Sequence, residues 1–101
     1  MKSGLYFARS ASVAARRMGV EIIVMSAMDS SLLTLNEIAS LIWEAADGLT
    51  PLDQIVASTI CTRFDVEPHR ALLDAEEMVK CLAARGFLKL SDQPIPSHEL
   101  R

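Results

Sequence analysis

The hydrophobic pattern of the chain changes its period between Leu35 and Asn36, and this change constrains the fold more than any other feature. Residues 31–35 are typical of a strand, whereas apolar residues recur at helical spacing after Asn36 and stop before Gly48. A strand that leads directly into a capped helix leaves a backbone edge beside a helical surface. Such an edge is a natural place for an extended peptide to bind, and nothing in this segment resembles a catalytic motif.

Length and composition predict one small binding module or subunit. The 101 residues suffice for a single core but not for a core and a large substrate pocket. Hydrophobic residues make up 50% of the chain and charged residues 23%, which is typical of a folded domain. No apolar stretch approaches the roughly 20 residues of a membrane-spanning helix, and no signal-peptide core follows Lys2. We therefore expect a cytoplasmic protein without a membrane partner.

Charge is distributed unevenly along the chain. The formal net charge is -3, yet residues 1–19 contain Lys2, Arg9, Arg16 and Arg17 and no acid, so the remainder is strongly acidic. A start with arginines and serines but no acids also fits a transit peptide, and that alternative stays open. Because the bases lead without a break into strand-like sequence, an ordinary basic first strand is favoured.

Three strands are predicted in the first third of the chain, at 12–18, 20–25 and 31–35. The second is the clearest, because β-branched and bulky residues precede a turn-like segment at 26–30. We expect the second and third strands to form a hairpin, and all three to form one antiparallel sheet. Residues 1–10 lack a periodic pattern and are expected to be flexible.

The first predicted helix has two candidate starts. Thr34 with Glu37 forms a capping box, and Asn36 is itself a favoured N-cap residue. Gly48 is expected to end the helix in a left-handed conformation, and Trp43 to pack at the edge of the buried face against a neighbouring element. That face is predicted to contain Ile38, Leu41, Ile42 and Ala45.

Two further helices are predicted to begin at prolines. Thr50 is the expected cap of one, with Pro51 at its first helical position, and Pro68 begins the other in the same way. The third helix is expected to end at Gly86. The core faces are predicted to be Leu52, Ile55, Val56 and Ile60 in the second helix, and Ala71, Leu72, Ala75, Met78, Val79 and Leu82 in the third.

The predicted fold class is α+β. It has an N-terminal three-stranded antiparallel β-sheet, three α-helices and a short C-terminal strand at 87–90, as in a small winged-helix-like domain. The domain is expected to span 11–90, between a flexible N-terminus at 1–10 and a flexible tail at 91–101.

Groups that could support chemistry are scattered rather than clustered. His69 and His98 have no carboxylate or cysteine at ligand or triad spacing. Cys61 and Cys81 are expected to be buried reduced thiols, with a disulfide as the alternative. The glycines are isolated, so no phosphate-binding loop is present. We therefore predict no catalytic residue, no metal site and no cofactor.

The alternative function is a winged-helix DNA-binding regulator that contacts phosphates through Arg9, Arg16 and Arg17. Charge argues against it, because the third predicted helix carries as many acids as bases. DNA binding is kept as the alternative, but no nucleic-acid partner is predicted.

One face of the third predicted helix lies outside the core stripe. Leu73, Glu77, Lys80 and Ala84 fall within about 60° on a helical wheel, with Cys81 nearby. We call this mixed apolar and charged face the ledge. A solvated face with one stray leucine explains the pattern equally well.

A series of short motifs spans most of the chain. Leu35-Asn36-Glu37, Ile42-Trp43-Glu44, Asp47-Gly48 and Thr50-Pro51-Leu52 follow one another, and a weaker match continues at 79–88. In order and spacing these motifs resemble the PqqD-like proteins, which are named after coenzyme pyrroloquinoline quinone (PQQ) synthesis protein D. The resemblance covers about residues 12–90.

The resemblance implies a non-catalytic recognition element for ribosomally synthesised precursor peptides. Such a domain binds the leader of the precursor and presents it to a maturation enzyme, often a radical S-adenosylmethionine (SAM) protein. In the family the leader adds as a strand beside the third strand and lies against the third helix. Carried over to this sequence, the peptide-binding residues are Ser31, Leu32, Leu33, Thr34, Leu35, Leu73, Glu77, Lys80, Cys81 and Ala84.

Two sequence features leave the biosynthetic pathway open, and the oligomeric state is open as well. The turn at 26–30 lacks the glycine or proline common there in the family, and the first strand lacks a Trp-Asp motif. PQQ synthesis is therefore one pathway among several, with lasso and radical-matured peptides as others. A homodimer also stays open, because small domains of this kind often pair through terminal helices or strands.

Overall fold

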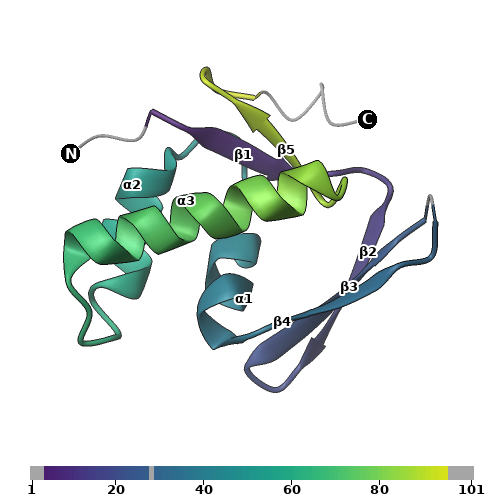
Figure 1. Ribbon diagram of the computed structural model, residues 1–101, viewed down its shortest axis with the longest axis horizontal. Coiled ribbons are helices and arrows are strands. Elements are labelled where there is room, and N and C mark those ends of the chain that lie inside the picture. Colours follow the sequence, from purple (N-terminus) through teal and green to yellow (C-terminus); the bar gives the residue numbers. More distant parts are fainter. Residues whose placement is uncertain (1–3, 28, 96–101) are drawn as a thin grey trace.

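The computed structural model describes residues 4–27 and 29–95 of the chain (Figure 1). Its α+β architecture combines antiparallel strands with three α-helices and one π-helical turn, η1. The strands are β1 (Tyr6–Arg9), β2 (Val13–Met18), β3 (Glu21–Ser26), β4 (Leu32–Leu35) and β5 (Leu88–Ser91). The helices are α1 (Glu37–Glu44), α2 (Leu52–Ile55), η1 (Val56–Ile60) and α3 (Pro68–Ala84).

The strands form two sheets rather than one. The expected three-stranded sheet is present, with β3 in the centre and β2 and β4 at its edges, all antiparallel. Its register places Leu33 opposite Val24. The second sheet pairs β1 with β5 antiparallel, and places Phe7 opposite Leu90 (Figure 1).

Strand β1 corrects the expectation that residues 1–10 are flexible. Phe7 and Ala8 are fully buried, and β1 pairs with a strand from the other end of the chain. A four-residue strand is too short to show a period, and its pairing partner is remote in sequence. The expected flexibility of residues 1–3 concerns positions outside the described residues.

The segment after β5 also differs from the expected tail. Ser91 still belongs to β5, and Ile95 is 3% exposed and donates its N–H to the carbonyl of Gly48. Gly48 has a φ of +77°, and a Cβ atom there would lie 2.6 Å from the carbonyl oxygen of Ile95. Gly48 therefore permits close approach of the C-terminal segment, whereas the expected tail at 96–101 lies outside the described residues.

Helix α1 starts at one of the two expected positions but turns a different face to the core. Asn36 is the N-cap, since its side-chain oxygen accepts the N–H of Ala39 at 2.9 Å. Trp43 is 3% exposed, so its expected place at the edge of the buried face is wrong. The helix ends at Glu44, before Gly48. The buried residues are Ala39, Ser40, Ile42 and Trp43, while Ile38, Leu41 and Ala45 are half-buried.

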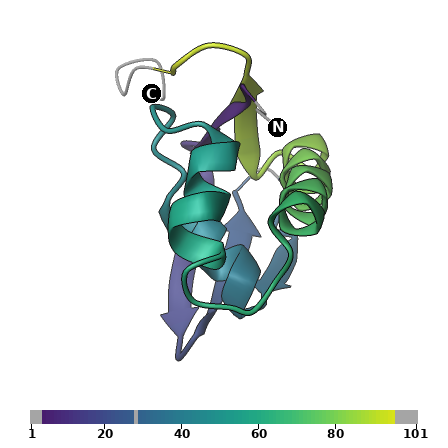
Figure 2. The same ribbon diagram turned by 90° about the vertical axis from the view of Figure 1, so that its left-hand side faces the viewer.

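The other helices keep most of their expected core faces. All four residues predicted for the second helix are buried, although α2 covers only the first two and η1 continues the chain. Thr50 does not cap α2, because its hydroxyl bonds to Asp47 instead. In α3 the buried residues are Leu72, Ala75, Val79 and Leu82, and the predicted Ala71 and Met78 are half-buried. Figure 2 looks nearly along α3 and shows α2 and η1 beside it.

Candidate functional site

Strand β4 is an edge strand, and its hydrogen-bond pattern determines which backbone groups face outward. The N–H of Ser26 donates to the carbonyl of Ser31 at 3.0 Å, so Ser31 starts the series of residues bonded to β3. In an antiparallel pair these residues alternate with residues whose N–H and C=O point away from the partner. Leu33 therefore bonds to β3, whereas Leu32 and Thr34 direct their backbone groups to the open edge.

The open edge has none of the usual protection against pairing with another chain. It contains no proline and no charged side chain, and among the described strands β4 pairs only with β3. The side chain of Leu35 is buried in the core, while Leu32 is 63% exposed on the opposite face. An extended peptide therefore has free backbone groups to bond with along β4.

A short hydrogen-bonded turn fixes the start of this edge. The Asp29 carboxylate accepts two hydrogen bonds from Ser31, one from the backbone N–H at 3.0 Å and one from the side-chain hydroxyl at 2.8 Å. These bonds lower the pKa of Asp29. Ser30 has a φ of 60°, so a serine takes the left-handed position for which glycine is usual. The turn therefore forms without the glycine or proline that is common there in the PqqD-like proteins.

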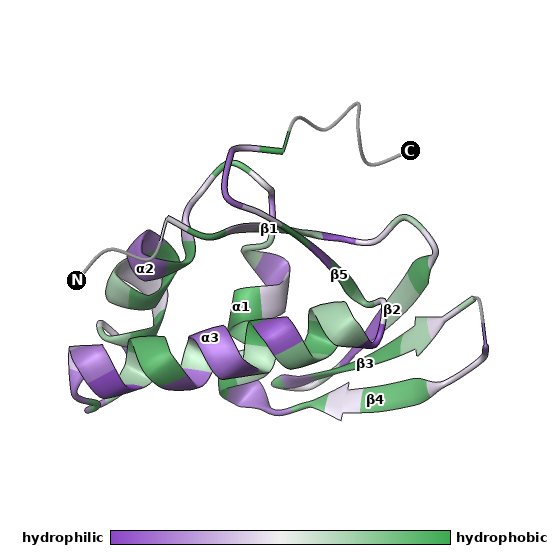
Figure 3. Cartoon of the chain, turned by 45° about the horizontal axis from the view of Figure 1, so that its top comes forward, coloured by the Kyte–Doolittle hydropathy of each residue, from purple (hydrophilic) through white to green (hydrophobic). Residues whose placement is uncertain are grey.

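A groove of about 520 Å³ separates β4 from the C-terminal half of α3. Figure 3 shows the largely hydrophobic ribbons of β3 and β4 next to α3. The groove brings together parts of the two segments that were predicted from the sequence to bind a peptide, residues 31–35 and the ledge. Its lining residues are Leu33, Thr34, Leu35, Asn36, Ala39, Asp74, Glu77, Met78, Cys81, Leu82 and Arg85.

The groove contains half of the sequence-predicted site residues. Leu33, Thr34, Leu35, Glu77 and Cys81 line it. Ser31 is half-buried at the start of the edge. Leu32, Leu73, Lys80 and Ala84 are exposed and do not line the groove, which places most of the ledge on the solvent side of α3.

Sequence reasoning misses six lining residues for an identifiable reason. Met78 and Leu82 belong to the predicted core stripe, and Ala39 lies on α1, which a wheel of α3 cannot include. Asp74, on α3, and Arg85, the C-cap of that helix, border the groove at different heights. A helical wheel of α3 would identify Met78 and Arg85 as candidate site residues if the edge of the core stripe were considered together with the exposed face. The sixth residue, Asn36, is predicted only as a cap.

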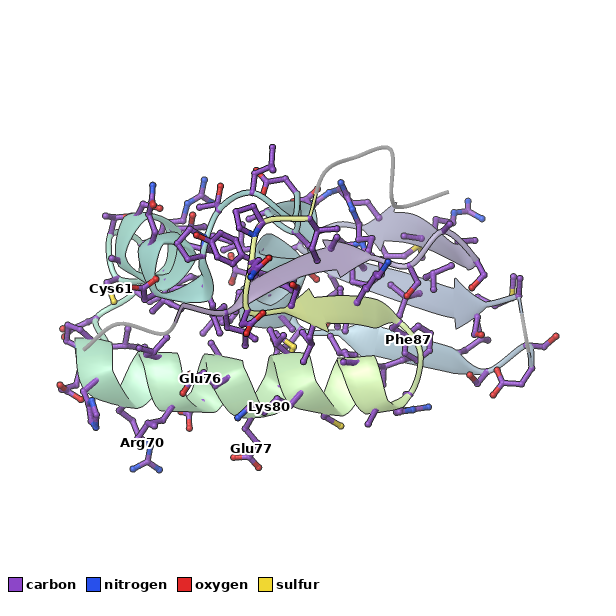
Figure 4. The ribbon with its side chains drawn as sticks, turned by 90° about the horizontal axis from the view of Figure 1, so that it is seen from above. Cys61, Arg70, Glu76, Glu77, Lys80 and Phe87 are labelled. Carbon is purple, nitrogen blue, oxygen red and sulfur yellow. The ribbon has the colours of Figure 1, made fainter. Side chains whose placement is uncertain are left out.

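The charges along the groove differ from one end to the other. Asp74 and Glu77 are acids of the more N-terminal turns of α3, whereas Arg85 follows its last turn. The guanidinium of Arg85 lies 5.5 Å from the ring centre of Phe87, which supports a cation–π contact. Arg70 pairs with Asp74 at 3.5 Å, and Figure 4 shows Arg70 and Glu77 projecting away from the core.

The described residues offer no cluster for metal chemistry. No group of three or more His, Cys, Asp or Glu side chains within 4–27 and 29–95 is arranged to hold a metal ion. Cys61 and Cys81 are free thiols, but Cys81 is exposed and Cys61 half-buried, so the expectation of two buried thiols is wrong. Within the same ranges, no helix has the length and apolar character needed to cross a membrane.

The bases considered for DNA contact do not form one surface. Arg17 is paired with Glu44 on α1, and its neighbour Arg16 points to the opposite face of β2. Arg9 lies on β1, in the other sheet. The geometry therefore gives no support to the DNA-binding alternative.

Comparison with known proteins gives one family and one structural likeness. The family model for "Coenzyme PQQ synthesis protein D (PqqD)" matches residues 21–88, from the first residue of β3 into β5. A search of curated proteins found no match. A solved structure described as "TbiB1 in Complex with the TbiA(beta) Leader Peptide" is similar to this chain, with a TM-score of 0.74 and 20% sequence identity. The likeness covers 81% of this chain and 94% of that one, and shows that the two share a fold.

Proposed function

The chain belongs to the PqqD family, and on this premise we propose that it recognises the leader of a ribosomally synthesised precursor peptide. It presents that leader to a modifying enzyme and catalyses no reaction itself. The observation that carries the proposal is the unprotected edge of β4 beside the groove along α3. The structurally similar TbiB1 is in complex with a leader peptide, which supports the same kind of ligand here.

The proposed binding mode is addition of the leader as a further strand. Leu32 and Thr34 exchange backbone hydrogen bonds with the peptide, which supplies affinity for any extended sequence. Side chains of the peptide that enter the groove supply specificity. Exposed ion pairs at Glu77 or Lys80 contribute only about 0–1 kcal/mol, so apolar contacts in the groove dominate.

The proposal includes the finer description of the site and its partners. The domain is winged-helix-like and acts in the cytoplasm, and the modifying enzyme belongs to a natural product pathway such as PQQ, lasso or radical SAM peptide maturation. A homodimer is compatible with it. The proposed peptide-binding residues are Ser31, Leu32, Leu33, Thr34, Leu35, Leu73, Glu77, Lys80, Cys81 and Ala84.

Hydrogen exchange at single amides tests the mode of binding. In the free protein the amide of Leu33 should exchange slowly, whereas those of Leu32 and Thr34 should exchange fast because they face the open edge. Adding the leader of a precursor encoded beside this gene should protect Leu32 and Thr34 selectively. Unchanged exchange at both amides in the presence of saturating leader would exclude strand addition.

Substitutions separate the groove from the ledge. Cys81→Glu places a charge in the groove and should weaken leader binding at least tenfold, measured by calorimetry. Leu73→Asp should weaken binding less, because Leu73 is 44% exposed on the ledge. Ala57→Glu, an exposed control on η1, should bind like the wild type. All three should keep the wild-type circular dichroism spectrum.

A further inference from the structure

A second, more apolar pocket adjoins the groove along β4. This pocket has a volume of about 410 Å³ and lies between α1, η1 and the N-terminal half of α3. Four residues line both spaces, namely Asn36, Ala39, Asp74 and Met78. The two spaces are therefore adjacent, and a ligand that passes the end of β4 comes within reach of this pocket.

The walls of the pocket are suited to an apolar side chain. Its floor contains Ile42, Ile60 and Ala75, which are buried in the core. Its upper walls are only partly covered, since Ala71 is half-buried and Val66 is 37% exposed. Apolar surface left in water at a concave site favours a ligand that covers it.

The rim of the pocket carries more acid than base. Glu67 and Asp74 border it, and Arg70 is the one base among the described residues of the lining. Arg70 is engaged within its own helix and cap. Its side chain pairs with Asp74, and its backbone N–H donates to the carboxylate of Glu67. Glu77 adds a further carboxylate where the groove begins. This excess of acid favours a basic residue on the ligand.

We propose that this pocket binds a large apolar side chain of the same peptide that pairs with β4, with a basic residue next to it. The inference rests on the proposed function and adds an anchor to it. All neighbours in this sheet are antiparallel, and an antiparallel peptide passes the Asn36 end of β4 before it pairs with Thr34. The anchor therefore precedes the paired stretch by no more than about five residues.

The adjacency of the two spaces argues for one peptide rather than a separate small molecule. Because groove and pocket share four lining residues, a peptide strand bound along β4 runs past the pocket. The acidic rim also disfavours a fatty acid or another anionic lipid. An extended chain with an apolar anchor and a base meets both the shape and the charge.

Selection from a peptide library identifies the anchor and does not require the sequence of the leader. Random 14-residue peptides displayed on messenger RNA are selected on the immobilised full-length protein. Enriched peptides should share a Leu, Ile, Phe, Tyr or Trp at one fixed position and a Lys or Arg beside it. One enriched peptide then serves as the probe for all affinity and NMR measurements.

Two variants and two controls test the pocket with that peptide. Ala71→Leu fills the pocket and should weaken binding roughly tenfold, while Ala57→Leu adds the same bulk at an exposed position of η1 outside the groove and the pocket and should have no effect. Asp74→Lys should weaken binding about threefold to tenfold, whereas Asp92→Lys makes the same charge change outside the groove. Because Asp74 is exposed, its replacement keeps the fold even if Ala71→Leu disturbs packing.

The outcomes distinguish the anchor from the function on which it rests. Protection of Leu32 and Thr34 by the peptide, together with shifts at Ile38 and Ala71, supports both. Protection of the edge with unchanged signals at Ile38 and Ala71, and unchanged affinity of both variants, overturns the anchor and leaves leader recognition intact. Shifts at the pocket alone, without protection of the edge, overturn both, as does the absence of any enriched peptide.

Discussion

At the scale of single residues, polar side chains determine where the elements around the groove begin. Asn36 caps α1 through Ala39, and Glu67 caps α3 by accepting the N–H groups of His69 at 3.1 Å and Arg70 at 2.7 Å. Asp29 closes the β3–β4 turn in a similar way through Ser31. Each carboxylate or amide satisfies backbone donors that the element itself leaves unpaired.

The cap at Glu67 predicts a dependence of stability on acid. Hydrogen bonds from Arg70 and His69 hold the pKa of Glu67 below its ordinary value of 4.5. Because this pKa is lower in the folded chain, the contribution is complete above pH 4.5 and is lost as pH falls through the folded value. The melting temperature of the wild type should therefore exceed that of Glu67→Gln near pH 6 and approach it near pH 3, as measured by thermal unfolding.

The difference between the two proteins is the informative quantity, because Asp29 and Asp47 also have lowered pKa values and contribute to acid sensitivity in both. A constant difference from pH 6 to pH 3 would contradict the assigned role of the cap.

Single residues are partly predictable from the sequence. Asn36 is one of two predicted caps, because its side chain has the right length to accept from a helical N–H. The choice between Asn36 and Thr34 depends on where β4 ends, which its pairing with β3 decides. Glu67 is not among the predicted caps, because the pattern at Pro68 marks the first helical residue and not the acid that precedes it.

At the scale of elements, the agreement is better for α2, η1 and α3 than for α1. Four of the six residues predicted for the core stripe of α3 are buried, and the four apolar residues predicted for α2 and η1 are all confirmed as buried. Helix α1 agrees less well, because its buried face is broad and includes Ala39, Ser40 and Trp43 beside the predicted Ile42. A single stripe is a poor guide to a helix whose buried face is this broad.

Strand β4 gives the sharpest prediction at this scale. Thr34→Pro removes an N–H that faces the open edge, so the sheet should persist while leader binding is lost. Thr34→Val keeps the N–H and the β-branched shape and should bind like the wild type. Binding is measured by calorimetry, and folding by circular dichroism and melting temperature.

A third variant tests the side of β4 that pairs with β3. Leu33→Pro removes a bond to β3 and should unfold the sheet or lower the melting temperature strongly. Normal leader binding by Thr34→Pro would show that the peptide does not pair with this edge.

At the scale of the whole molecule, contacts between the chain ends are the part that sequence cannot predict. Strands β1 and β5 lie on either side of all other elements in sequence, yet they pair and bury Phe7. No local period reports such a pairing, because each strand has four residues. For the same reason the sequence predicts the β4 side and the α3 side of the groove separately, but not that they face each other. Only the tertiary fold brings β4 and α3 together.

Gly48 tests how closely the C-terminal segment is held. Gly48→Ala should destabilise the protein by about 1 kcal/mol more than Gly19→Ala, as measured by urea unfolding. Both positions have a left-handed φ, +77° and +67°, so the backbone cost of alanine is similar. Only at Gly48 does the new Cβ meet Ile95, whereas nothing lies within 4 Å at Gly19. Equal losses of stability would mean that the approach of Ile95 contributes little.

The pairing of β1 with β5 also determines how this domain can be attached to larger proteins. Figure 1 shows this pair on the side of the molecule away from β4, so the chain enters and leaves the fold far from the open edge. A polypeptide fused before Tyr6 or after Ile95 therefore extends from the opposite side and leaves the groove accessible. The same geometry makes the domain a suitable module for grafting onto an unrelated enzyme, in order to direct that enzyme to a tagged peptide.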